Sequence, residues 1–131
     1  TDLAANSLPQ FSFIVPNIMH DAHTGPPREA DTWLQTNVAG PLTSTAAFKT
    51  GGDGILVVDF DEGFLSDTAN GGGHVSPLFW GPLVRSGYKQ SSNTLYLHES
   101  MLATIMAALG LQNPPGQAAS APVMAEFFAQ Q

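Results

Sequence analysis

The segment ILVVDFDEGF at positions 55–64 constrains the fold of this chain more than any other stretch. It opens with an unbroken run of branched apolar residues, which is typical of a buried strand covered on both faces, as in parallel sheets. The run is followed by two adjacent carboxylates, Asp61 and Glu62. Because ligands of open α/β sheets bind beyond the carboxyl ends of the strands, these acids are well placed to bind a hard cation. The alternative is a strand end with solvated acids, since burying an unpaired charge is costly.

Length and composition narrow the possible functions. The 131 residues fit a single domain, 1–131, with a moderate core. We expect no membrane-spanning helix, because no stretch of about 18 apolar residues exists, and no signal peptide, because no basic region precedes an apolar run at the start. The absence of cysteine excludes disulfides and thiolate metal sites. Four scattered Lys and Arg residues against a net charge of −7 argue against nucleic-acid binding.

The order of the predicted elements indicates an α/β fold. Strands are predicted over 11–15, 55–58 and 75–80, and helices over 31–37, with Asp31 as N-cap, and over 98–109, with Gly110 as its stop. Shorter helices are predicted over 44–49 and near Val123, Phe127 and Phe128. This order suggests a three-layer α/β/α arrangement around a mostly parallel sheet. Three strands make a small sheet, so we expect it to be part of a larger one.

Polar side chains follow or precede each predicted strand. His20, Asp21 and His23 lie in the loop after the first strand, the acid pair follows the second, and His74 precedes the third. Carboxylates together with imidazoles suit divalent metals, and histidine can protonate or stabilise a phosphoryl oxygen near neutral pH. The alternative for each histidine is an ordinary solvated loop position. The chain contains no Walker loop, dinucleotide fingerprint, HExxH or GxSxG motif.

Five segments occur in an order that resembles one known family. They are FSFIVPNIMHDAHTG, ADTWL, ILVVDFDEG, GGGHVSPLFWGPLVRSGY and YLHESMLATIMAALGL. Together they cover most of residues 11–111 and resemble the C-terminal half of the phosphoesterase family. This family includes bacterial phosphatidylcholine-type phospholipases C and acid phosphatases and belongs to the alkaline-phosphatase superfamily. The resemblance implies a partial alkaline-phosphatase-like core and a C-terminal segment of a larger catalytic domain.

The resemblance also assigns roles to the candidate residues. It implies that Asp61 and Glu62 ligate a divalent metal ion of unspecified identity. It implies that His20, His23 and His74 are catalytic and that Asp21 and His74 contact the substrate, all of them lining a phosphate pocket. Two-metal relatives hold a second metal in this region, whereas single-metal relatives use histidines there to contact the phosphoryl group. Both arrangements stay open for this chain.

This sequence lacks two motifs of the family that catalysis requires. The family's nucleophilic Ser or Thr and an early Glu-Asn pair come from an N-terminal half, and no segment here matches either. The resemblance therefore implies a metal-dependent phosphoric ester hydrolase, of phospholipase C or acid phosphatase type, whose C-terminal half is inactive alone. The missing half would come from N-terminal sequence or another chain, and relatives of this kind are commonly exported, periplasmic or secreted. The competing interpretations are a non-catalytic cation- or ligand-binding module and a structural partner of such a chain.

Overall fold

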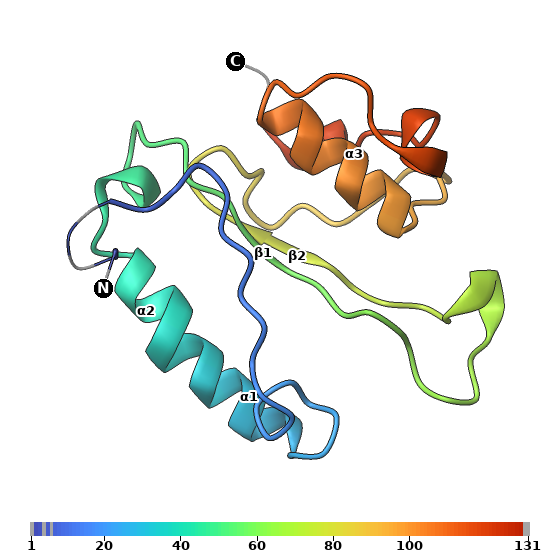
Figure 1. Cartoon of the computed structure of the whole chain (residues 1–131), viewed down its shortest axis with the longest axis horizontal. Helices are drawn as coiled ribbons and strands as arrows, with labels where there is room; N and C mark the ends of the chain where they lie inside the picture. Colours follow the sequence, from blue (N-terminus) through green and yellow to red (C-terminus); the bar gives the residue numbers. More distant parts are fainter. Residues whose placement is uncertain (1, 4, 6, 130–131) are drawn as a thin grey trace. The chain divides into compact units, whose positions relative to one another are not determined.

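The computed structural model describes residues 2, 3, 5 and 7–129 (Figure 1). The chain divides into two compact units, residues 1–83 and 84–131, and each is considered by itself. Among the described residues, no helix is both long and apolar enough to cross a membrane.

The first regular element of the first unit is a helical rod. It consists of α1 (Pro27–Leu34), the π-helical turn η1 (Gln35–Ala39) and α2 (Gly40–Leu42). The helix starts four residues before the predicted N-cap Asp31, because Pro26 is extended and Pro27 occupies the first turn, where the missing N–H costs nothing. The π-helical turn ends just before Pro41, whose missing N–H interrupts the regular hydrogen-bond ladder. Val38 and Leu42 are the buried residues of the rod.

The sheet of this unit has two strands. They are β1 (Leu56–Val58) and β2 (Leu78–Trp80), preceded by the short helices η2 (Ala46–Phe48) and η3 (Ala69–Gly71) respectively. The two strands pair antiparallel, with Val57 opposite Phe79. The short helix predicted over 44–49 is present as η2, and its Phe48 ring stacks on Trp80 with centroids 5.1 Å apart.

The antiparallel pairing differs from the mostly parallel sheet that the sequence predicted. A parallel neighbour needs a long crossover, usually a helix, whereas an antiparallel neighbour can follow any returning loop. The segment between β1 and β2 contains only the short η3, so it returns the chain directly. The described residues therefore support an α/β composition, but not a three-layer parallel core.

Residues 11–15, predicted to form a strand, form none among the described residues. The segment is highly exposed: 82% of the Phe13 surface and 73% of the Val15 surface is accessible. A strand requires a partner for its backbone N–H and C=O groups. The apolar alternation of this segment is thus present without the pairing that it predicts.

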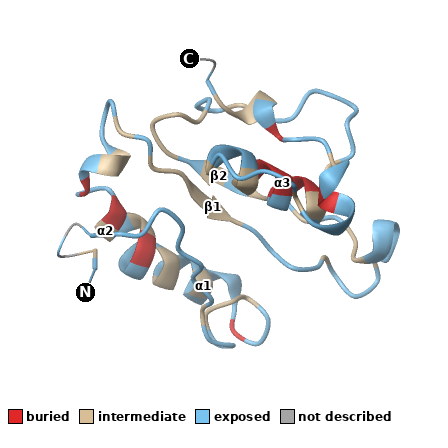
Figure 2. Ribbon diagram, turned by 45° about the horizontal axis from the view of Figure 1, so that its top comes forward, coloured by how far each residue is buried: buried red, intermediate tan, exposed pale blue. Residues whose placement is uncertain are grey.

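The second unit is built on α3 (His98–Ala108), followed by η4 (Gly116–Ala119) and η5 (Ala125–Phe127). The helix confirms the prediction over 98–109, and Gly110 follows it with a φ of 68°, which glycine adopts without strain. Buried side chains gather on α3 and on the segments after it (Figure 2): Ser100, Met101, Ala103, Thr104, Ala118 and Met124.

A hydrogen-bonded cluster around Glu126 fastens the end of this unit to the loop before α3. The Glu126 carboxylate accepts hydrogen bonds from three hydroxyls, those of Tyr88, Ser92 (2.7 Å) and Tyr96 (2.8 Å). These bonds lower the pKa of Glu126, the one from Tyr88 most. Burial raises the pKa of Tyr96, and its bond to Glu126 raises it further. The cluster thus holds a charged carboxylate at neutral pH.

Candidate functional site

The acid pair and His74 lie on two segments that continue the β1–β2 ribbon. Beyond the strands, the Gly63 N–H donates to the Gly72 carbonyl at 2.6 Å, and Figure 1 shows the two segments side by side as far as η3. A Cβ atom on Gly63 would lie 3.0 Å from both the backbone N and O of His74, so this position favours glycine. The fold therefore brings the backbone of His74 next to Gly63, the residue that follows the acid pair.

The side chains of Asp61 and Glu62 are exposed. One Asp61 carboxylate oxygen accepts the backbone N–H of Glu62 at 3.0 Å, which fixes the direction of the turn. Their oxygens are suitable ligands for a hard cation. However, the described part of the chain contains no group of three or more His, Asp or Glu side chains arranged to hold a metal. The residues present supply two ligands but not a complete site, so the metal site stays a prediction.

The loop with His20, Asp21 and His23 is a tight turn. One Asp21 carboxylate oxygen accepts the backbone N–H of His23 at 2.8 Å, and Ala22 between them has a φ of 68°, a costly conformation for a residue with a Cβ. The His23 ring nitrogen Nδ1 lies 3.2 Å from the Thr24 hydroxyl. Asp21 thus shapes its own loop with one oxygen, and its predicted contact with substrate stays a prediction.

His20 has an environment unlike that of the other two loop residues. Its ring stacks on Trp33 of α1 at 5.9 Å between centroids, with 16° between the planes. Its Nδ1 atom is buried and has no hydrogen-bond partner among the described residues. Because buried polar atoms are rarely left without a partner, this nitrogen is suited to a water, a ligand or a further protein group. The prediction that His20 or His23 approaches the acid pair stays a prediction.

Sequence reasoning missed two residues beside these candidates. Trp33 lies in the ADTWL segment and in the predicted helix 31–37, but its stacking on His20 was not predicted. Asp67 was not singled out at all. Its carboxylate accepts the backbone N–H of His74 at 2.9 Å, a contact with a backbone group that no motif would reveal.

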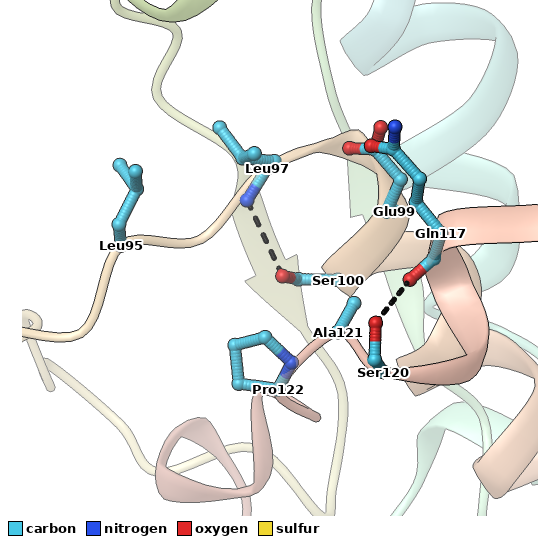
Figure 3. A pocket seen from close by; sticks show the side chains of 8 residues that line it. All are labelled: Leu95, Leu97, Glu99, Ser100, Gln117, Ser120, Ala121 and Pro122. Carbon is cyan, nitrogen blue, oxygen red and sulfur yellow. Dashed lines mark hydrogen bonds between the residues drawn. The ribbon is translucent and has the colours of Figure 1, made fainter.

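A separate hollow of about 220 Å³ lies in the second unit (Figure 3). Its walls include Leu95, Leu97 and Pro122 on the apolar side and Glu99 and Gln117 on the polar side. None of the predicted site residues lines it. We therefore do not assign the phosphate chemistry to this hollow.

Two adjacent carboxylates and a histidine thus lie on neighbouring segments, as the resemblance of the ordered motifs to a phosphoesterase leads us to expect. Comparison with known proteins agrees: the chain belongs to the Phosphoesterase family, whose model matches residues 1–112. The family resemblance predicted from the ordered motifs is therefore confirmed.

Three curated proteins show the extent of this likeness. The chain is 29% identical over 121 residues to a phosphatidylinositol-3-phosphatase of Mycobacterium tuberculosis, covering 92% of this chain and 36% of that protein. It is 32% identical over 111 residues to a phosphate-repressible acid phosphatase of Penicillium chrysogenum, covering 84% and 26% respectively. It is 31% identical over 110 residues to an acid phosphatase of Aspergillus fumigatus, covering 84% and 24%. The chain thus spans about a quarter to a third of the length of these relatives. No solved structure matches it.

Proposed function

We propose that this chain is the C-terminal part of a metal-dependent phosphoric ester hydrolase of the acid phosphatase type. The observation that carries the proposal is the Gly63–Gly72 contact, which sets the backbone of His74 beside the segment that carries Asp61 and Glu62. Family membership and three relatives named as phosphatases support the ester class. Their names favour a phosphatase over the phospholipase C type, which was the other activity implied by the sequence.

In this proposal the chain's own residues bind and orient the phosphoryl group. Asp61 and Glu62 would ligate a divalent metal, whose charge would neutralise that of the phosphoryl oxygens. The further ligands would have to come from outside the described residues, and we derive no step through the metal. His74, His20 and His23 would donate hydrogen bonds to non-bridging oxygens or a proton to the leaving oxygen, and Asp21 would fix the His23 loop and contact the substrate.

We further propose that additional sequence, either N-terminal to this chain or on another chain, extends the antiparallel β1–β2 pair into a larger, mostly parallel sheet. Exposed apolar side chains lie where such strands would pack: Phe13, Ile14 and Val15 lie on the unpaired segment, and Leu78 and Trp80 on β2. Exposed apolar side chains of this kind are expected where another protein segment binds. The nucleophilic Ser or Thr would arrive with these strands, and export of the whole enzyme is the localisation that the family favours.

Divalent cation binding tests the metal ligands directly. We expect Asp61→Asn to weaken Mn²⁺ binding by about tenfold or more, because a carboxylate ligand becomes a neutral amide. Asp53→Asn, an exposed acid in the turn before β1, is the matched control and should bind like the parent. Calorimetric titration of the three proteins gives the affinities. Equal binding by Asp61→Asn and the parent would contradict the metal-ligand assignment.

Hydrolysis of an aryl phosphate with added divalent metals tests the division of the active site. We expect the 131-residue chain alone to show little or no turnover, and a longer polypeptide carrying the Glu-Asn pair and the nucleophile to be active. Metal-dependent turnover by this chain, abolished by changing one of its own hydroxyl residues, would show that the nucleophile has been misplaced. A longer polypeptide that binds the cation without hydrolysing esters would instead favour the non-catalytic binding module.

A further inference from the structure

The loop that leads to His74 is closed by one side chain, Asp67. Its Oδ2 atom accepts the backbone N–H of His74 at 2.9 Å, and its Oδ1 atom accepts the backbone N–H of Ala69 at 3.1 Å. The Asp67 N–H donates to the Phe64 carbonyl at 2.7 Å. Both carboxylate oxygens are thus bonded to the backbone of the same loop, which fixes where His74 enters the ribbon.

Glycines allow the backbone to pass close to this carboxylate. Gly73 has a φ of 78°, and a Cβ atom there would lie 2.6 Å from the Asp67 carbonyl oxygen and 3.0 Å from its Cγ atom. On the other side, Gly63 packs against the backbone of His74. His74 is therefore held between Asp67 and the glycine that follows the acid pair.

The charge of Asp67 is stabilised by backbone dipoles. No Lys or Arg occurs between Lys49 and Arg85. Hydrogen bonds from the backbone of His74 and of Ala69 lower the pKa of Asp67. A charged acceptor shortens and strengthens such bonds relative to a neutral one. The ionised carboxylate is thus the form that closes the loop.

We propose that Asp67 is a positioning residue that holds His74 beside the Asp61–Glu62 pair. The expected effect of Asp67 on phosphate binding rests on the proposed function, because that function assigns His74 to the phosphoryl group. The geometric basis of the proposal stands on the hydrogen bonds of the loop alone. Asp67 acts through the backbone of His74 and does not itself touch the substrate.

Hydrogen exchange of the His74 amide in the full chain tests the geometric basis. We expect exchange to become about tenfold faster or more in Asp67→Ala, as expected when a hydrogen bond to a charged group is lost. Asp67→Asn should lie between Ala and the parent, because its one carbonyl oxygen replaces only one of the two acceptors. Asp53→Asn should exchange like the parent at His74. The amides of Val57 and Phe79 report whether the β1–β2 ribbon stays folded.

Titration with inorganic phosphate, followed at the ring protons of His74 by NMR, tests the consequence. We expect phosphate to shift these signals in the parent and in Asp53→Asn, and to shift them less at equal phosphate concentration in both Asp67 variants. An unchanged His74 exchange rate in Asp67→Asn and Asp67→Ala, with the ribbon intact, would overturn the proposal. Faster exchange in the variants, with no phosphate-dependent shift in the parent, would support the positioning by Asp67 and refute the role given to His74 under the proposed function.

Discussion

The hydroxyl of Thr104 is the most sharply testable contact in the second unit. It donates to the Ser100 carbonyl at 2.6 Å and accepts the backbone N–H of Met124 at 2.9 Å. Thr104 is 6% exposed and Met124 is 3% exposed, so water cannot replace either bond. This one side chain therefore satisfies a buried N–H that lies 20 residues further along the chain.

Replacing Thr104 by Val keeps the shape of the side chain and removes both hydrogen bonds. The Met124 N–H would then stay buried without an acceptor, which costs about 2 kcal/mol of unfolding free energy. Thr104→Ser keeps the hydroxyl and loses one methyl group, which costs about 1 kcal/mol. The two variants should differ most in the exchange of the Met124 amide, fast in Thr104→Val and near the parent rate in Thr104→Ser.

The assay has to report on the second unit, because both tryptophans, Trp33 and Trp80, lie in the first. Near-ultraviolet circular dichroism of the tyrosines during urea unfolding, together with amide exchange at Met124, meets this need. Ser120→Ala is the matched control in the same unit: its hydroxyl donates to the backbone carbonyl of Gln117 at 3.3 Å, but at an exposed position. It should change stability by less than about 0.5 kcal/mol. Equal stability of Thr104→Val and the parent, with unchanged Met124 exchange, would refute the reasoning.

Two further predictions follow from the acidic cluster and from the loop glycines. The hydrogen bonds that lower the pKa of Glu126 stabilise the second unit at pH values above the ordinary pKa of a glutamate, and this stabilisation is lost as the pH falls through the lowered pKa. Glu126→Gln should therefore lower the free energy of unfolding at neutral pH and make it depend less on pH in the acid range. Urea unfolding at several pH values measures both effects. Gly73→Ala should destabilise the first unit more than Gly51→Ala does. Both glycines have a positive φ, so both substitutions strain the backbone. Only at Gly73 would the new Cβ atom also collide with the backbone of Asp67, whereas nothing lies within 4 Å of a Cβ atom at Gly51. Thermal unfolding followed by tryptophan fluorescence compares the two, and equal losses would contradict the close approach at Gly73.

Helices that are specified by short-range sequence patterns were predicted well. The spacing of Met101, Ile105 and Leu109 and the stop at Gly110 gave α3 nearly to the residue, because helix periodicity and a glycine cap act over a few positions. The start of α1 was placed too late, since Asp31 and Pro27 both suit a first turn and the sequence does not say which one is used.

The long-range features were not predictable from these patterns. The apolar run before Asp59 identifies β1 but carries no information on the direction of its neighbour, which depends on how the chain between the strands returns. The acid pair and His74 were expected to be close, and their segments are adjacent along the ribbon. Asp67 was missed because it bonds backbone N–H groups, and any loop residue offers those.

Two segments with strand-like sequences, 11–15 and β1, are more exposed than strands inside a complete sheet would be. An apolar run such as 55–58 is expected to be covered on both faces, yet all three residues of β1 are only partly buried. Phe13 and Val15 keep the alternation of a strand but have no partner strand among the described residues. The relatives, of which the matched region covers only 24% to 36%, contain further sequence that could supply that partner strand. We infer that 11–15 pairs with such a strand in the complete sheet, and this pairing would also carry the loop with His20 toward Asp61 and Glu62, which follow β1.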